Sequence, residues 1–320
     1  MMINDYMPEG TRIGTAENRE YISSIQGLER AMQQGKILEA TVLVCDSDLN
    51  LHVDLFGLDG VIEKKEAVLC RENESIKDIA IITRVGKAVC FKVLDIDKSK
   101  SPAVVRLSRR EAQSECANNY FSGLICGDII KAKVTHLENF GAFVDIGCGI
   151  SSLLSVDCLS VSRISHPRDR LSPGMTIDVI VKTIDRENKR IFVSRRELLG
   201  TWEENVAMFE VGQTVAGIVR SIESYGVFIE LAPNLAGLAE LKDGSPTDYC
   251  EVGQTCAVYI KSIVPERMKV KLVLIDVSSE ESPKKNTKTF IDTDKVSHID
   301  YWRYSPASAT KVVETYFDIQ

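Results

Sequence analysis

Two pairs of aromatic side chains, Phe140 with Phe143 and Tyr225 with Phe228, occur in the same short phrase at two places in the chain. Each phrase reads aromatic residue, glycine, small residue, phenylalanine, β-branched residue and acid, and the segments 139–146 and 224–231 begin 85 residues apart. Rings that stand close together with so little bulk around them suit stacking on flat ligands such as nucleobases. The repeat therefore predicts two related binding surfaces.

The spacing of these rings makes a demand on the backbone. Residues three apart point to opposite faces of an ideal strand, so Phe140 and Phe143 can meet one ligand only if the chain bends at Gly141. The alternative is that one of the two phenylalanines belongs to the core. The recurrence of the pattern favours at least one exposed stacking ring in each copy.

A polar turn at residues 185–189 lies downstream of the first ring pair. Arg190 follows this turn, and a guanidinium beside aromatic rings can bridge a phosphate or stack on a base. A solvated turn charge is an equally good interpretation of Arg190. Asp185 can accept a hydrogen bond from a base amino group, but a cap of its own turn is slightly favoured.

Three lysines and one histidine are further candidates for ligand contact. Lys131, Lys133 and Lys182 are plausible phosphate partners, although a single lysine is more often a solvated surface charge. His166 precedes Pro167 in a loop, where its ring can stack on a base. A loop histidine satisfied by a neighbouring carbonyl is the favoured interpretation of His166.

Residue patterns typical of catalysis are absent from the sequence. The four histidines have no metal-ligand spacing with one another or with cysteine. The segment 147–149 (GCG) lacks the third glycine of a dinucleotide-binding loop and is predicted to be a hairpin turn. We therefore expect no enzymatic activity, no cofactor, no bound metal and no small-molecule substrate.

The repetition extends beyond the aromatic phrase and predicts the architecture. Residues 126–134 match 211–219, and 173–179 match 252–258, so the last copy is shorter by six residues between these points. A degenerate first copy begins at Gly35. About five short strands in about 70 residues favour a small closed barrel over a sandwich. The fold class expected is mainly β, with three tandem five-stranded β-barrels joined by short helices; the family resemblance described below implies that these barrels are OB-folds.

The predicted organisation has seven parts: an N-terminal arm with a helix (1–34), a degenerate repeat (35–108), a helical linker (109–126), the middle repeat (127–200), a second helical linker (201–210), the third repeat (211–277) and a C-terminal tail (278–320).

The predicted helices rest on capping signals and helical spacing. Ser/Thr-x-x-Glu capping boxes begin at Ser108, Ser194 and Thr201. Apolar residues at helical spacing predict one amphipathic helix over residues 17–34 that docks on the first barrel. Residues 278–289 are rich in Ser, Lys and Glu and are interpreted as a linker, followed by a partly ordered aromatic tail that packs on the third barrel.

Charge and composition limit the classes of function. The net charge is −7 for the whole chain, but residues 127–200 hold 11 Lys/Arg against 9 Asp/Glu, so the middle repeat is positive by two. The first repeat (11 against 12) and the third (6 against 8) are negative. The middle repeat is thus both the electropositive one and the one with two Phe, which indicates that it is the main binding module.

Cysteine usage and hydropathy indicate the compartment. Nine scattered cysteines without a Cys-x-x-Cys pair are typical of reduced thiols in a cytoplasmic protein. No apolar run approaches the roughly 20 residues of a membrane span, and the N-terminus lacks a secretory signal. We expect a cytoplasmic protein with no membrane partner.

The middle repeat resembles the S1 RNA-binding domain. The resemblance rests on 127–134 (GDIIKAKV), 140–147 (FGAFVDIG), 164–167 (ISHP), 173–175 (PGM) and 184–194 (IDRENKRIFVS). The multi-repeat layout is similar to the ribosomal protein S1 family in its shorter bacterial form. The resemblance spans residues 35–277, is strongest in the middle repeat, and implies oligonucleotide-binding barrels that hold single-stranded RNA.

In that family two aromatics, a His, an Asp and an Arg line the binding face. The resemblance places the middle repeat's aromatics at Phe140 and Phe143, its Asp at Asp185 and its Arg at Arg190. Ser155 occupies the His position, so one expected contact is missing.

The other two repeats depart further from the family pattern. In the third, the aromatics are Tyr225 and Phe228, while the His, Asp and Arg positions hold Glu240, Val264 and Lys269. That face keeps its stacking rings and loses most polar partners. In the first, Asp97 survives, but Leu49 and His52 stand where rings are expected. The first repeat is therefore interpreted as a docking module or as non-binding.

Together these observations predict a non-enzymatic single-stranded RNA (mRNA) binder that acts in translation at the small ribosomal subunit. RNA-binding residues are expected at the aromatic pairs and at Asp185, Arg190, Lys131, Lys133, His166 and Lys269. One alternative is a protein–protein adaptor or RNA-decay factor that docks on a ribosome or ribonuclease, which the net charge favours. A second alternative, a nuclease accessory, lacks paired carboxylates beside a basic cleft.

Overall fold

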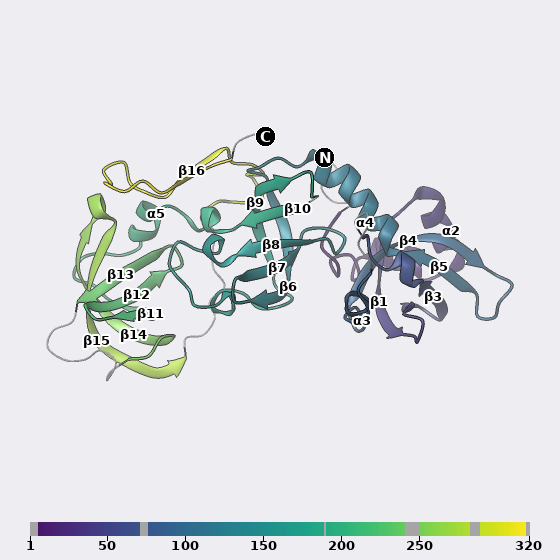
Figure 1. Cartoon of the computed structure of the whole chain (residues 1–320), viewed down its shortest axis with the longest axis horizontal. Helices are drawn as coiled ribbons and strands as arrows, with labels where there is room; N and C mark the ends of the chain where they lie inside the picture. The colour runs from purple at the N-terminus through teal and green to yellow at the C-terminus, as the bar shows by residue number, and fades with distance from the viewer. Residues whose placement is uncertain (1–5, 71–75, 189, 241–249, 282–288, 318–320) are drawn as a thin grey trace. The chain divides into compact units, whose positions relative to one another are not determined.

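The strands of this chain close into three five-stranded barrels followed by a small two-stranded sheet, which confirms the mainly β fold class (Figure 1). The computed structural model describes residues 6–70, 76–188, 190–240, 250–281 and 289–317. The chain divides into two compact units. The first holds residues 1–124, 131–133 and 145–151, and the second holds 125–130, 134–144 and 152–320.

The first barrel has the strand order β1-β2-β3-β5-β4, in which the last strand returns to the first. Its third and fifth strands pair in parallel, and its other pairs are antiparallel. This closure leaves no sheet edge, as in an OB-fold. The strands are β1 (Leu38–Cys45), β2 (Leu51–Leu55), β3 (Leu58–Ile62), β4 (Ala88–Asp97) and β5 (Val104–Ser108).

The middle and third barrels repeat this order, with their own third and fifth strands again parallel. The middle barrel has β6 (Ile129–Glu138), β7 (Gly141–Asp145), β8 (Ser151–Ser155), β9 (Thr176–Asp185) and β10 (Arg190–Ser194). The third has β11 (Thr214–Glu223), β12 (Gly226–Ala232), β13 (Leu235–Glu240), β14 (Gln254–Val264) and β15 (Lys269–Glu281).

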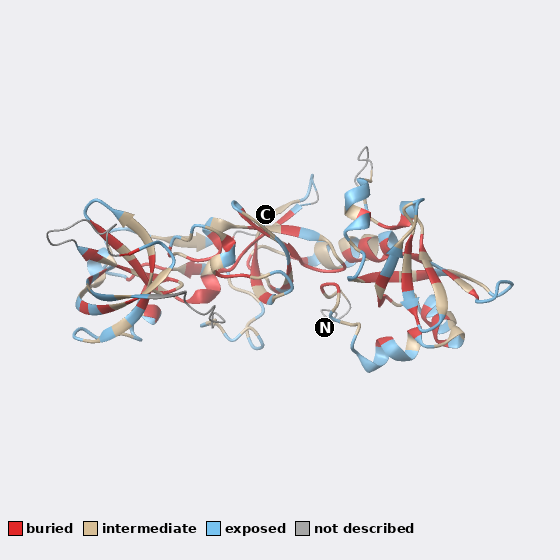
Figure 2. Ribbon diagram, turned by 90° about the horizontal axis from the view of Figure 1, so that it is seen from below, coloured by how far each residue is buried: buried red, intermediate tan, exposed pale blue. Residues whose placement is uncertain are grey.

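Strand alternation separates the barrel cores from the outer faces. In β10 the side chains of Ile191 and Val193 are buried, whereas Arg190 is exposed and Phe192 is half-buried. Figure 2 shows buried residues spread along the strands of each barrel. Because side chains alternate along a strand, the residues between core positions are presented outward, where a ligand can reach them.

The N-terminal helix predicted over residues 17–34 is wrong in one respect, because the structure divides it in two. Helix α1 spans Ala16–Ile22, and α2 spans Ile25–Gln34. Ser24 caps α2 by accepting a hydrogen bond from the Gly27 amide. Gly27 packs so closely on the α1 backbone that a Cβ there would lie 2.4 Å from the Tyr21 carbonyl oxygen. The N-cap at Ser24 thus starts a new helix, although the apolar spacing continues across it.

The linkers are short helices, with caps at two of the three predicted positions. Ser108 caps α4 (Arg109–Glu115) and Thr201 forms a complete capping box at α5 (Trp202–Val206). Ser194 instead donates its hydroxyl to the Glu197 carboxylate, and the 3-10 turn Arg196–Leu199 follows. A further short helix, α3 (Asp78–Ile82), lies within the first repeat.

The tail departs from the prediction at both ends. Strand β15 continues to Glu281, so residues 278–281 are strand rather than linker; residues 282–288 lie outside the described part. Beyond them β16 (Tyr301–Arg303) pairs with β17 (Glu314–Tyr316). Trp302 and Tyr304 join the core of the third barrel, whereas Phe317 packs against Ile180 and Leu198 of the middle barrel. The tail therefore contacts two barrels instead of the expected one.

Candidate nucleic-acid interface

Phe140 and Phe143 form one outward-facing ring pair on the middle barrel. Their ring centroids lie 6.0 Å apart and their planes meet at 88°, an edge-to-face arrangement. Phe140 is 55% exposed, and Phe143 is half-buried between the core residues Ala142 and Val144. The pair thus offers aromatic surface outside the barrel, while Ala142 and Val144 of β7 belong to the core.

The position of Phe140 resolves the alternation problem without a bend inside the strand. Phe140 lies in the turn that precedes β7, so strand alternation does not govern its direction. Its carbonyl oxygen accepts a hydrogen bond from the Val156 amide at 2.9 Å. A Cβ at Gly141 would lie 2.5 Å from the Leu154 carbonyl oxygen. Glycine is therefore needed because the β8 backbone comes so close.

The third barrel repeats this geometry with Tyr225 and Phe228. Their centroids lie 6.2 Å apart at an interplanar angle of 89°, and Tyr225 is 59% exposed. A Cβ at Gly226 would lie 2.7 Å from the Ala239 carbonyl oxygen. Two barrels thus build the same ring pair in the same way: a turn aromatic, a closely packed glycine and an outward phenylalanine two residues after the glycine.

Strand register extends each outer face beyond the ring pair. In the third barrel Phe228 lies opposite Leu238, and Leu238 lies opposite Lys271. In the middle barrel the corresponding pairing sets Phe192 opposite Leu153. Sequence reasoning missed both Phe192 and Lys271. The alternation of buried residues along β10 was the signal that could have found Phe192.

Asp185 and Arg190 face each other across the β9–β10 hairpin. Asp185 accepts hydrogen bonds from the backbone amide and the side-chain amide of Asn188, at 2.9 and 2.8 Å. Both hydrogen bonds lower the pKa of Asp185, and the bond from the backbone amide has the larger effect. Asp185 is thus engaged in its turn, as the favoured interpretation had it, while Arg190 is exposed beside it.

The predicted lysines and the histidine have other local partners. Lys133 donates from Nζ to the Glu9 carbonyl oxygen at 2.8 Å, and Lys131 and Lys133 belong to the first compact unit, whereas the Phe140–Phe143 pair belongs to the second. His166 accepts from the Arg168 amide at 3.0 Å and caps a 3-10 turn, so its ring is satisfied by an amide rather than by a carbonyl.

The outer face of the third barrel carries two lysines, Lys269 and Lys271, and the acid Glu240. Lys269 begins β15 opposite Val264 and is exposed. Lys271, two residues on and on the same side of the strand, forms an exposed ion pair with Glu240 at 3.3 Å. This face therefore carries an acid, Glu240, at the position where the resemblance leads one to expect a histidine.

In the first barrel a histidine replaces the strand phenylalanine. Register sets His52 opposite Val61 and Val61 opposite Arg106, as it sets Phe228, Leu238 and Lys271 in the third barrel. The His52 ring lies between Asp59 (Nδ1–Oδ1 3.0 Å) and Asp46 (Nε2–Oδ2 3.4 Å). The hydrogen bond that the His52 ring donates to the Asp59 carboxylate is the main cause that raises the pKa of His52.

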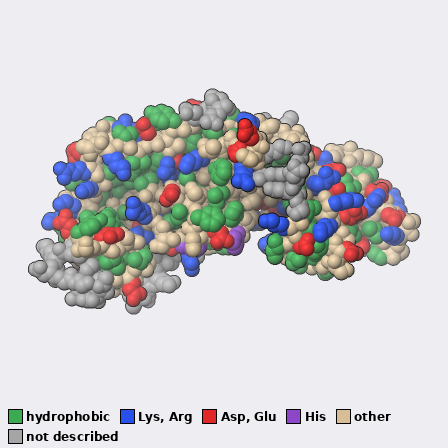
Figure 3. All heavy atoms as spheres, in the orientation of Figure 1, with side chains coloured by type: hydrophobic (Ala, Val, Ile, Leu, Met, Phe, Trp, Pro, Cys, Tyr) green, Lys and Arg blue, Asp and Glu red, His purple; other side chains and the backbone are tan. Residues whose placement is uncertain are grey.

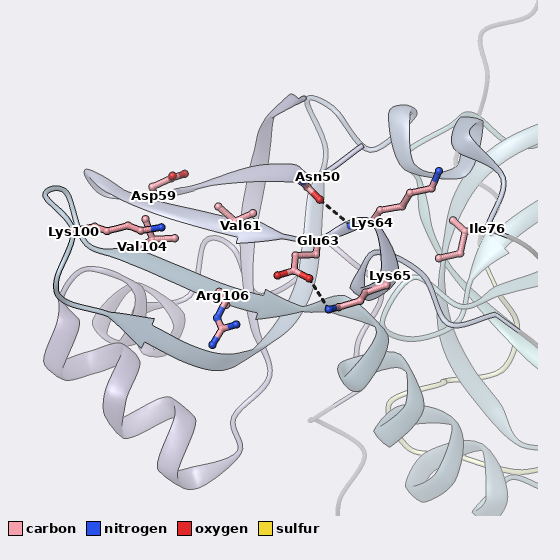
Figure 4. Close-up of a pocket in the computed structure, with 10 residues that line it drawn as sticks. All are labelled: Asn50, Asp59, Val61, Glu63, Lys64, Lys65, Ile76, Lys100, Val104 and Arg106. Atoms are coloured by element: carbon pink, nitrogen blue, oxygen red, sulfur yellow. Dashed lines mark hydrogen bonds and ion pairs between the residues drawn. The ribbon is translucent and has the colours of Figure 1, made fainter. Parts of the chain in front are cut away.

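An open groove of about 850 Å³ lies on this first-barrel face (Figure 4). Its cations are compensated: Lys65 pairs with Glu63 at 2.8 Å, and Arg106 pairs with Asp95 at 2.7 Å. Figure 3 likewise shows blue and red side chains interspersed over the first barrel. Balanced charges without an aromatic pair give phosphate little net attraction.

Within the described residues, no group of three or more His, Cys, Asp or Glu side chains is placed to hold a metal ion. None of the helices in that part of the chain is long and apolar enough to cross a membrane.

Three closed barrels with one strand order define a class of protein, the proteins built from tandem five-stranded barrels of OB type. Residues 125–196 match the family model of the S1 RNA binding domain. Over 307 residues the chain is 30% identical to small ribosomal subunit protein bS1 of Staphylococcus haemolyticus, covering 92% of this chain and 76% of that protein. The chain belongs to the bS1 family.

Other relatives align over shorter stretches. The chain is 31% identical over 215 residues to the bS1 homolog of Bacillus subtilis, covering 64% of this chain and 55% of the relative. The chain is 30% identical over 220 residues to bS1 of Staphylococcus saprophyticus, which covers 65% of this chain and 56% of that protein. The chain thus spans little more than half the length of these two relatives.

Solved structures give a weaker likeness. A multidomain protein with nucleic acid binding domains from Streptococcus pneumoniae covers 77% of this chain and 75% of its own, at 16% identity and a TM-score of 0.23. GSP13 from Bacillus subtilis covers 23% of this chain and 56% of its own, at 27% identity and a TM-score of 0.22. The fold assignment rests on the strand pairing alone.

Proposed function

We propose that the chain binds single-stranded RNA, with the middle barrel supplying most of the affinity and the third barrel extending the track. The observation that carries this proposal is the recurrence of the exposed edge-to-face ring pair on two barrels. Base stacking on such rings contributes about 1–3 kcal/mol per base and tolerates any sequence. Arg190 adds a phosphate or stacking partner on the middle barrel.

The setting is translation in the cytoplasm, where the protein holds unstructured mRNA at the small ribosomal subunit. The names of the relatives support this setting. The protein acts without catalysis or a cofactor, because stacking and phosphate neutralisation require neither. The paired charges on the first barrel favour contact with a protein surface over contact with RNA, so that barrel serves as the docking module.

A filter-binding assay with the full chain tests the proposal. An unstructured single-stranded RNA and a duplex RNA of the same length are titrated at the same salt concentration. The proposal predicts tight retention of the single strand and weak retention of the duplex, whose stacked bases cannot reach the rings. Equal retention of both, or of neither, contradicts it. Co-sedimentation with small subunits, with and without nuclease treatment, then separates direct docking from tethering through RNA.

A further inference from the structure

A buried thiol and a lysine amine meet on the middle barrel. The Nζ atom of Lys182 lies 3.1 Å from the Sγ atom of Cys158, at hydrogen-bonding distance. Cys158 is 2% exposed, and Lys182 is half-buried. In the described part of the chain no carboxylate pairs with Lys182, so the thiol is the polar partner that the structure gives this amine.

The backbone holds both groups in place. On β9, Thr183 pairs with Phe192 and Val181 pairs with Val193, so Lys182 is the extra residue of a β-bulge. Bulges redirect the side chain of the extra residue. Cys158 ends the 3-10 turn Val156–Cys158 that follows β8, and its carbonyl oxygen accepts a hydrogen bond from the Arg195 amide at 2.8 Å. The contact is therefore built by two anchored segments.

We propose that Cys158 and Lys182 form an oxidative modification site, at which a peroxide joins the two side chains through a covalent N–O–S bridge. The inference rests on the contact between nitrogen and sulfur and does not depend on RNA binding. Thiols are oxidised first to sulfenic acids, and at this site an amine nitrogen that peroxide can oxidise to a hydroxylamine lies 3.1 Å from the sulfur.

Two molecules of hydrogen peroxide balance the reaction. One converts the Cys158 thiol to a sulfenic acid and leaves as water. The other converts the Lys182 amine to a hydroxylamine and leaves as water. The hydroxylamine oxygen then attacks the sulfenic sulfur, the sulfur–hydroxyl bond breaks, and a third water departs. The protein loses four electrons in all, gains one oxygen atom and loses two hydrogen atoms.

The bridge would join β9 to the turn that follows β8, beside the end of β10, where the Ser194 hydroxyl donates to the Cys158 carbonyl oxygen at 3.3 Å. β10 carries Arg190 and Phe192 on the outer face. The reaction starts from the neutral amine, so a protonated Lys182 first releases its proton to solvent, and the bridged nitrogen is uncharged. Excess dithiol reverses the modification, since two dithiol molecules return four electrons and restore the free amine, the free thiol and one water.

Other cysteines in the chain provide internal comparisons. The Sγ atom of Cys45 lies 3.8 Å from the Asp46 carbonyl oxygen, and that of Cys256 lies 3.6 Å from the Gly217 carbonyl oxygen. With a carbonyl as neighbour in place of an amine, these thiols are expected to stop at oxygen acids of sulfur or at mixed disulfides. Only Cys158 should yield a link to lysine among these three.

The test treats the full chain with hydrogen peroxide and digests it without reductant. Mass spectrometry is expected to detect peptides joined at Cys158 and Lys182, with one oxygen gained and two hydrogens lost, and dithiothreitol should separate them. The Lys182→Arg and Cys158→Ser variants should each lack the joined species. A thermal melt of each variant verifies folding, and Lys182→Arg alone decides the matter if the serine variant unfolds. Cys158 found unmodified, or oxidised while Lys182 is intact, overturns the proposal.

Discussion

Arg170 of the middle barrel and Glu230 of the third barrel form an ion pair, Nη2 to Oε2 2.5 Å, in which each side chain is 5% exposed. The same Glu230 oxygen accepts a hydrogen bond from Arg220 Nε at 2.7 Å, and Arg220 also pairs with Asp169 at 3.3 Å. The second compact unit is thus held together by a buried charge network in addition to the apolar packing of the tail.

Removing the acid from this network should destabilise the second unit strongly. Glu230→Ala leaves the charges of Arg170 and Arg220 buried, which costs about 3–5 kcal/mol. Urea unfolding followed by tryptophan fluorescence measures the loss, because Trp202 and Trp302 are both buried in the core cluster of the third barrel. Glu240→Ala, which breaks the exposed pair with Lys271, is the matched control and should cost less than about 1 kcal/mol. An equal loss of unfolding free energy in the two variants would show that the buried charge network does not stabilise the second unit.

A second prediction concerns Glu39, a buried acid of the first unit. Its Oε2 atom accepts hydrogen bonds from the amides of Gly10, Arg12 and Ile13, while Oε1 is buried without a partner. Burial, reinforced by the nearby Glu9 carboxylate, raises the pKa of Glu39 to about 7. The unfolded state has a carboxyl pKa of about 4.3. The folded state therefore keeps the Glu39 proton up to a higher pH than the unfolded state does.

Because the folded state binds more protons between about pH 4 and pH 7, this group's contribution to the unfolding free energy falls as pH rises through that window. Glu39→Gln is always neutral, so thermal melts should show its stability relative to the parent increasing from pH 5 to pH 8. Glu66→Gln is the control: its lowered folded pKa makes its contribution to stability fall only as pH drops below about 4.3, so its difference from the parent should stay constant from pH 5 to pH 8. Burial alone would raise the pKa of Glu66, but hydrogen bonds from Arg110 and Ser108 lower it. A pH-independent difference at Glu39 would contradict the argument.

The barrels and the ring pairs could be predicted because their sequence patterns recur within the chain. The phrases around Gly141 and Gly226 carry alternation, turn chemistry and a closely packed glycine in each copy. The tail could be predicted only in part: its packing on the third barrel was expected, as Trp302 shows, whereas the contact of Phe317 with the middle barrel follows from no periodicity in the sequence. The partners of Lys133 and Lys182, a carbonyl and a thiol, likewise depend on tertiary contacts that no local pattern encodes.

A third prediction tests the role of glycine beneath the rings. Gly141→Ala forces a Cβ to within 2.5 Å of the Leu154 carbonyl oxygen, so β7 must move away from β8. Overpacking of this kind costs about 1–3 kcal/mol, and the displaced Phe140 should weaken RNA binding several-fold in anisotropy titrations. Gly123→Ala is the control, because a Cβ at Gly123 meets only open space. Unchanged stability and affinity in Gly141→Ala would reject this account of the turn.

A fourth prediction separates phosphate contact from solvated charge at Arg190. If Arg190 neutralises one phosphate, Arg190→Gln should reduce the slope of log affinity against log salt by about 0.7. The measurement is a set of titrations of single-stranded RNA at several salt concentrations. Arg186→Gln removes a neighbouring exposed charge from the same hairpin and should leave the slope nearly unchanged. An identical slope in Arg190→Gln and the parent would assign Arg190 to solvent.

The central claim is that exposed aromatic pairs bind unpaired bases, and a double substitution on the middle barrel tests it most directly. Fluorescence anisotropy of a labelled unstructured RNA is compared for the parent, for Phe140→Ala with Phe143→Ala, and for Phe56→Ala, which removes an exposed ring of the first barrel. With about 1–3 kcal/mol for each stacked base, the double variant should bind at least several-fold more weakly while Phe56→Ala binds like the parent. A correctly folded double variant with parental affinity would contradict the account.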